Sequence, residues 1–144
     1  MNKEPIIIVA GEPNSIFLEI FFKSIKKKIY NRPLIIIVSK KLLEEQMKKL
    51  GFLFKINTID QNFKYFDNLD NKKINLIDVK YKFNKCFEKI SSKSNSYIEK
   101  TFAIALKILI QNKFSKFING PISKKYFLNG KSLGITEYLA KKTK

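Results

Sequence analysis

Histidine is absent from the 144-residue chain, and Cys86 is its only cysteine. A typical zinc site is built from several Cys and His side chains, and a Ser or Cys nucleophile usually relies on a His partner. Neither chemistry is therefore available to this chain by itself. A single cysteine also excludes a disulfide within the chain, which fits a reducing compartment.

Arginine is scarce as well, because Arg32 is the only one among 29 basic residues. With 12 acidic residues the formal net charge is +17, which suggests a polyanionic partner. Phosphate and base readout, however, favours the forked guanidinium of arginine over the lysine ammonium. We therefore assign most of the charge to the codon bias of an A/T-rich genome and expect no nucleic-acid partner. A lysine-rich module that binds nucleic acid or another polyanion is the alternative.

Long hydrophobic runs are also missing. The first apolar run covers residues 6–10 and stops at Gly11. It is too short for a secretory signal and far too short to span a bilayer. We therefore expect a cytoplasmic protein with no membrane partner. A chain of this length can bury a core as one domain without disulfides or a structural metal.

What is present is an alternation of apolar strands and amphipathic helices. Short β-branched runs predict strands buried on both faces, and apolar residues at helical spacing predict the helices between them. The predicted strands are residues 6–10, 34–38, 52–56, 74–79 and 114–118. The predicted helices are residues 16–30, 40–50, 97–112, 122–128 and 136–144. This order predicts a single α/β unit over residues 1–144, with a mainly parallel sheet flanked by helices.

Four details of the helices are specific enough to test. Pro121 suits the first turn of the helix at 122–128, and Thr136 suits the N-cap of the last helix. That last helix reaches Lys144 with no strand after it, so we expect the fold to be incomplete. The predicted buried face of the first helix consists of Ile16, Ile20, Phe21, Ile25 and Ile29.

Two loops lie where α/β proteins bind their ligands, beyond the carboxyl ends of parallel strands. They cover residues 11–15 and 119–124. In the second loop, Gly120 allows close approach to the backbone, while a helix starting at Pro121 and the ammonium of Lys124 favour an anion. The sequence therefore predicts a phosphate or carboxylate site, with an ordinary strand-to-helix turn as the alternative. The dinucleotide fingerprint and the P-loop are both missing.

Three ordered blocks of sequence resemble one enzyme family. They are residues 8–13 (Ile-Val-Ala-Gly-Glu-Pro), 117–124 (Phe-Ile-Asn-Gly-Pro-Ile-Ser-Lys) and 134–140 (Gly-Ile-Thr-Glu-Tyr-Leu-Ala). They are similar to Thr-Pro-Gly-Glu-Pro, Thr-Gly-Pro-Ile-x-Lys and Gly-His-Thr-Glu-Tyr/Phe-Leu-Ala in the 4-hydroxythreonine-4-phosphate dehydrogenase family of vitamin B6 biosynthesis. The proteins of that family are much longer, so the resemblance covers their N-terminal half only.

The resemblance implies a function, a fold and partners. It implies an isocitrate/isopropylmalate-dehydrogenase-like fold, a homodimer, and NAD-dependent oxidation of 4-phosphooxy-L-threonine in pyridoxal phosphate biosynthesis. In the family, a divalent metal (Zn, Mg or Co) held by histidines polarises the reacting hydroxyl. Those histidines and most NAD contacts lie downstream of the blocks present here. We therefore expect neither NAD nor metal to bind this chain alone, and no activity from it alone.

Matched residue by residue, the resemblance assigns substrate binding to Thr136, Lys124, Gly120 and Glu12. Ile135 stands where the family has a substrate-binding histidine, and its aliphatic side chain cannot donate a hydrogen bond. The chain is thus expected to hold part of a substrate site and no metal site. A split enzyme, in which a second polypeptide supplies the histidines, is the alternative within enzymology.

Overall fold

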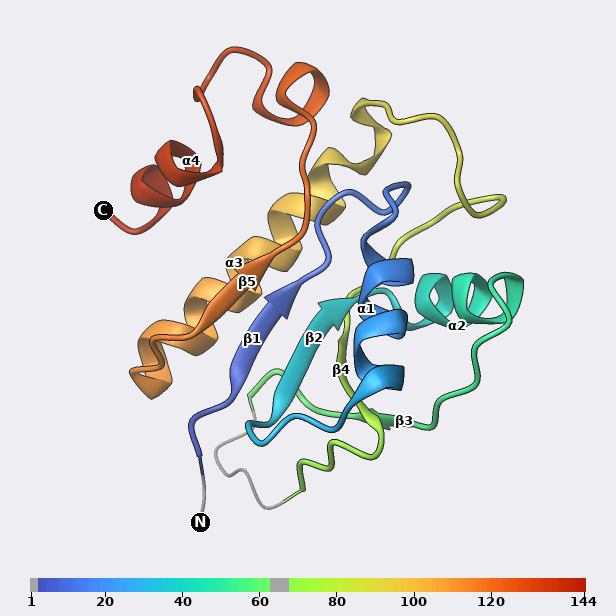
Figure 1. The fold of residues 1–144 in the computed structure, drawn as a ribbon. Coiled ribbons are helices and arrows are strands. Elements are labelled where there is room, and N and C mark those ends of the chain that lie inside the picture. The colour runs from blue at the N-terminus through green and yellow to red at the C-terminus, as the bar shows by residue number, and fades with distance from the viewer. Residues whose placement is uncertain (1–2, 63–67) are drawn as a thin grey trace.

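The computed structural model describes residues 3–62 and 68–144 (Figure 1). Its centre is a five-stranded sheet with the strand order β3-β4-β2-β1-β5, in which every neighbouring pair is parallel. The predicted α/β fold with a parallel sheet is confirmed. The strands are β1 (Ile6–Val9), β2 (Leu34–Val38), β3 (Ile56–Thr58), β4 (Ile74–Asp78) and β5 (Phe117–Asn119).

Helices cover both faces of this sheet (Figure 1). A 3-10 turn (Ser92–Ser94) precedes α3, and a π-helical turn (Lys124–Leu128) follows β5. One core cluster joins α1 and α2 to one face of the sheet, and the other joins α3 and α4 to the opposite face. The α-helices are α1 (Phe17–Lys27), α2 (Lys40–Lys49), α3 (Asn95–Asn112) and α4 (Ile135–Lys142).

The central strands form the core because successive side chains point to opposite faces of the sheet. Ile35 and Ile37 lie in the cluster with α3, and Ile36 lies in the cluster with α1 and α2. None of these three side chains has exposed surface. The continuous apolar runs therefore predicted burial on both faces correctly.

The predicted buried face of α1 is largely wrong. Phe21 is buried as predicted, but the other two buried side chains are Leu18 and Phe22. Phe22 packs on Phe52, with ring centroids 5.4 Å apart. Large aromatic rings bury more apolar area than isoleucine, so they decide which stripe of an Ile-rich and Phe-rich helix faces the core. Three of the isoleucines predicted to be buried are more than half exposed: Ile16, Ile20 and Ile29.

Several element boundaries also differ from the predictions. α1 ends at Lys27 rather than near Tyr30, and β3 pairs with β4 only from Ile56 onward. The predicted start of β5 at Phe114 is wrong because that residue closes α3. Lys113 adopts a left-handed conformation with φ of 56°, and the Phe114 N–H donates to the Leu109 carbonyl at 2.9 Å, as in a Schellman motif.

The corrected face of α1 can be tested with two truncations. We expect Phe22→Ala to lower the free energy of unfolding by about 3–5 kcal/mol, because it empties a fully buried aromatic site. Ile20→Ala, at a residue that is 54% exposed, should change it by less than about 1 kcal/mol. Guanidinium denaturation followed by circular dichroism measures both. Equal losses would contradict the observed orientation of α1.

Candidate functional site

The candidate site lies at the carboxyl edge of the sheet, where β1 and β5 end side by side (Figure 1). The N–H of Gly120 donates to the Val9 carbonyl at 2.6 Å. The N–H of Glu12 donates to the Pro121 carbonyl at 2.8 Å. The structure therefore brings together the two loops that the sequence singled out, although they are about a hundred positions apart.

Glycines make this contact between the two loops possible. A Cβ atom on Gly120 would lie 2.0 Å from the Ala10 carbonyl oxygen. A Cβ atom on Gly11 would lie 2.4 Å from the Pro121 carbonyl oxygen, and Gly11 also has a φ of +76°. No side chain fits at either point, and only glycine adopts such a φ without strain. The space beside Gly120 is therefore filled by the backbone of the neighbouring loop.

Glu12 connects the first loop to the start of α3. It is 3% exposed, and both of its carboxylate oxygens are hydrogen-bonded. One oxygen accepts the Asn14 N–H at 3.2 Å, and the other accepts the Ser94 hydroxyl at 3.0 Å. A buried carboxylate is tolerated only with partners of this kind. The sequence predicts no role for Ser94, because no local pattern signals a partner 82 positions away.

Two tyrosines stand beside this buried carboxylate. Burial raises the pKa of the Tyr81 phenol, and the charge of Glu12 raises it further. The Tyr81 ring packs on Tyr97 at 4.7 Å between centroids, and the Tyr97 hydroxyl accepts the Ser39 N–H at 2.9 Å. Burial raises the pKa of Tyr97 as well. Both phenols are therefore neutral at pH 7 and act as hydrogen-bonding groups rather than as bases.

The predicted helix forms only over Lys124–Leu128, and its predicted start at Pro121 is wrong. The Pro121 carbonyl accepts the Glu12 N–H, so it is not free to begin a helical ladder. The chain turns instead through the single π-helical turn at Lys124–Leu128, in which the Ser123 hydroxyl accepts the Tyr126 N–H at 3.0 Å. The Gly120 N–H donates to the Val9 carbonyl and is therefore not available to a ligand. The exposed ammonium of Lys124 remains as a cation in this loop.

The start of α4 differs from the prediction in its N-cap residue. Its N-cap is Gly134 rather than Thr136, and the Glu137 carboxylate accepts the Leu133 N–H at 2.6 Å. Thr136 therefore lies inside the first turn, where its side chain is exposed. Ile135 packs against the core cluster that contains α3. The predicted capping role of Thr136 is therefore wrong, and no side chain caps α4.

The carboxylates of this edge do not assemble a metal site. Over residues 3–62 and 68–144, no three His, Cys, Asp or Glu side chains come together as potential ligands. At the end of β4, Asp78 accepts the Lys40 N–H at 2.8 Å and lies 2.7 Å from the Lys80 ammonium. Burial raises the pKa of Asp78, but these two partners outweigh burial and hold the pKa below its usual value. The Asp78 carboxylate is thus used within the protein.

Comparison with known proteins gives the family. A family model described as pyridoxal phosphate biosynthetic protein PdxA matches residues 30–144. The chain belongs to this family. Its fold is similar to that of 4-hydroxythreonine-4-phosphate dehydrogenase from Burkholderia phymatum, with a TM-score of 0.77, 21% identity, and coverage of 95% of this chain and 42% of that chain. The enzyme from Klebsiella pneumoniae gives a TM-score of 0.78, 17% identity, and coverage of 96% and 44%.

The same comparisons show how much of the related chains this chain spans. This chain spans less than half of each of the two solved chains. At these identities the solved structures support the fold alone, and no curated protein sequence matches the chain. The matched PdxA region includes Gly120, Lys124, Ile135 and Thr136, whereas Glu12 precedes it. In the described part of the chain, no helix is long and apolar enough to cross a membrane.

Because the two loops are in contact, substitutions at two glycines should have different effects on the free energy of unfolding. Gly120→Ala should lower the free energy of unfolding by about 3 kcal/mol, because the new Cβ would overlap the Ala10 carbonyl. Gly134→Ala places a Cβ in open space and should cost less than about 1 kcal/mol. Chemical denaturation of both variants measures the difference. If the two losses are the same, the loops are not in contact.

Proposed function

We propose that this chain forms the substrate-binding part of an enzyme that oxidises 4-phosphooxy-L-threonine with NAD in pyridoxal phosphate biosynthesis. The observation that carries this proposal is the PdxA match, which includes the loop after β5 and the start of α4. The two similar solved structures are named 4-hydroxythreonine-4-phosphate dehydrogenase, which fits the same reaction. The homodimer and the cytoplasmic location stay predictions.

The proposed roles follow from what each side chain contacts. Lys124 is exposed at the carboxyl edge, so its ammonium is free to bind the phosphate or carboxylate of the substrate. The exposed Thr136 hydroxyl supplies a hydrogen bond to the same ligand. Glu12 and Gly120 act as positioning residues, because Glu12 is bonded to Ser94 and Gly120 lies against the neighbouring loop. Lys124 and Thr136 thus contact the substrate in this proposal, and Glu12 and Gly120 hold the surrounding loops in place.

The residues present do not fit the metal that the resemblance implies. The chain has no histidine, and its described carboxylates do not group as ligands. Ile135, at the position of a family histidine, packs on the core and has no titratable atom. We therefore assign no metal-dependent step and no proton transfer to this chain. The catalytic groups and the NAD contacts come from polypeptide outside these 144 residues.

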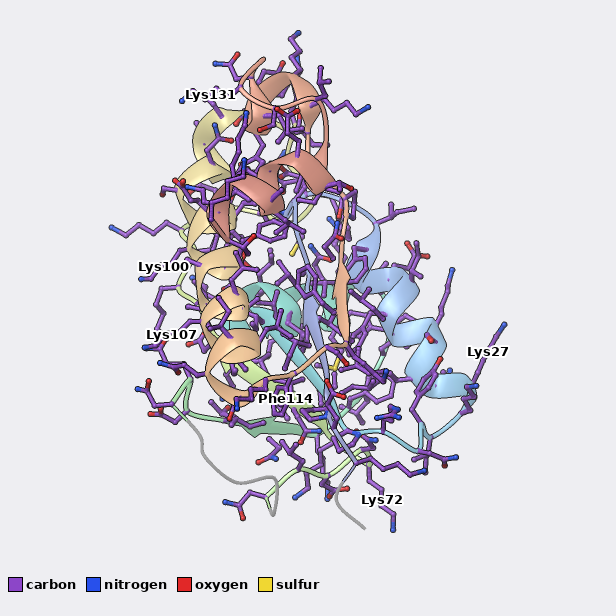
Figure 2. All side chains as sticks on the ribbon, turned by 90° about the vertical axis from the view of Figure 1, so that its left-hand side faces the viewer. Lys27, Lys72, Lys100, Lys107, Phe114 and Lys131 are labelled. Carbon is purple, nitrogen blue, oxygen red and sulfur yellow. The ribbon has the colours of Figure 1, made fainter. Side chains whose placement is uncertain are left out.

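Non-specific attraction to the lysine surface is the competing explanation for any anion binding. Figure 2 shows Lys27, Lys72 and Lys131 pointing away from different parts of the molecule. These three ammonium groups therefore do not line one common groove that could track a nucleic-acid backbone. This distribution favours a local site at Lys124 over a nucleic-acid interface.

Titration with 4-phosphooxy-L-threonine, followed by amide NMR, tests the proposed site. One charge-assisted contact contributes about 1.5–3 kcal/mol, and a millimolar dissociation constant corresponds to about 4 kcal/mol, so we expect millimolar binding. Lys124→Ala should weaken it by roughly tenfold, equivalent to about 1.4 kcal/mol. Lys27→Ala removes the same charge from the exposed end of α1 and should leave the affinity unchanged.

Two results would contradict the site. If both substitutions weaken binding equally, the general lysine surface explains the affinity. If the amides of Gly120, Ile122, Ser123, Lys124 and Thr136 do not shift while others do, the ligand binds elsewhere. Inorganic sulfate in a parallel titration controls for attraction to any divalent anion.

A further inference from the structure

A pocket of about 210 Å³ lies at the amino edge of the sheet, where the strands begin, and thus at the opposite end of the sheet from the candidate site (Figure 1). The end of α1 and the first residues of β2 and β4 line this amino-edge pocket. Its apolar lining consists of Phe21, Ile25, Ile29, Leu34, Phe54 and Ile74. A concave apolar surface binds the apolar part of a small molecule, and this volume, below the roughly 300–1,000 Å³ of drug-sized sites, suits a short one.

Hydrogen bonds fix the walls of the amino-edge pocket. The Asn71 side-chain nitrogen donates to the carbonyls of Tyr30 and Arg32, at 2.8 and 2.6 Å. The Asn71 side-chain oxygen accepts the Leu34 N–H at 3.1 Å. The Tyr30 hydroxyl is hydrogen-bonded to the Ser24 hydroxyl of α1. The segment between α1 and β2 is therefore tied both to α1 and to the loop before β4, so the pocket is already formed without a ligand.

The uncharged polar side chains of the lining are used within the protein. Asn75 follows the pattern of Asn71, because its nitrogen donates to the Leu34 carbonyl at 3.0 Å and its oxygen accepts the Asp70 N–H at 3.0 Å. The Tyr30 hydroxyl already has a partner in α1. A polar ligand without charge therefore gains little from these groups, since each would have to give up a bond that it already makes.

Lysines supply the remaining polar groups of the lining. Lys28, Lys72 and Lys73 line the pocket, and their side chains are exposed. The Lys28 ammonium lies 4.8 Å from the centroid of the Tyr30 ring. None of the described lining residues is an aspartate or a glutamate, and over residues 3–62 and 68–144 none of these three ammonium groups is in an ion pair. The charge at the mouth of the pocket is thus purely positive and attracts an anion.

We propose that the amino-edge pocket binds a short alkyl carboxylate. The alkyl chain lies on the apolar lining, and the carboxylate accepts charge-assisted hydrogen bonds from the lysines at the mouth. A cation with the same chain is repelled, and a carboxylate without the chain leaves the apolar lining uncovered. The site is separate from the proposed substrate site, because Lys124 follows β5 at the other edge of the sheet.

Titration of the purified chain with octanoate, followed by amide NMR, tests this pocket. We expect the amides of Ile29, Lys73 and Ile74 to shift, with nuclear Overhauser effects between octanoate and the Ile29 and Ile74 methyl groups. Acetate should bind about tenfold more weakly or less, because it buries no chain. Octyltrimethylammonium has the same chain and the opposite charge, and it should not shift these amides.

Two pairs of variants locate the site. Ile29→Asp should weaken octanoate binding about tenfold or more, because it puts a like charge beside the carboxylate. Ile20→Asp is the matched control, since Ile20 is 54% exposed against 65% for Ile29 and does not line the pocket. Lys28→Ala should weaken binding about threefold, as for an exposed ion pair. Lys27→Ala, at the neighbouring lysine outside the pocket, should leave it unchanged.

Four results would overturn the proposal. Octanoate could leave the amides of Ile29, Lys73 and Ile74 unshifted, or acetate could bind as tightly as octanoate. Octyltrimethylammonium could bind equally well, which would mean that the lysines play no part. The two members of either variant pair could weaken binding equally, which would place the ligand elsewhere. Lys124→Ala should leave octanoate binding unchanged, so this test and the test of the proposed substrate site fail independently.

Discussion

The backbone contact between the loops that follow β1 and β5 determines the geometry of the whole carboxyl edge. Gly11 and Gly120 allow the two loops to touch without intervening side chains. The contact occupies the Pro121 carbonyl, which moves the next turn to Lys124 and leaves that lysine exposed. Glu12 extends the same contact to Ser94 at the start of α3. Loops from three parts of the chain are thereby held in one place.

The sequence predicted best what local pattern controls. Continuous β-branched runs predicted the buried strand β2, and apolar residues at helical spacing predicted α2, which Ser39 caps by accepting the Leu42 N–H. The failures lie where distant contacts compete with local preference. Phe52 selects the buried face of α1, and Glu12 removes the Pro121 carbonyl from a local helix. Both partners are far from the affected segment in sequence, so periodicity and capping rules contain no signal of them.

For the candidate site, too, the sequence predicted what local pattern controls and missed what distant contacts decide. Short blocks of sequence were enough to identify the family, and the PdxA match confirms it. They were not enough to show that Glu12 is buried or that Gly134 replaces Thr136 as the cap. The absence of histidine, visible at once in the sequence, limits the chemistry more strongly than any feature of the fold. The chain therefore supplies no histidine as a metal ligand or as a proton acceptor.

Native-state hydrogen exchange of the Gly120 and Glu12 amides tests most directly whether the two loops form one rigid contact. Both N–H groups donate across the loops, at 2.6 and 2.8 Å. If the contact organises this edge, both amides should exchange only by global unfolding, as slowly as the amides of the central strand β2. Fast exchange of either amide under conditions that leave β2 protected would show that the loops open independently, and would contradict the account.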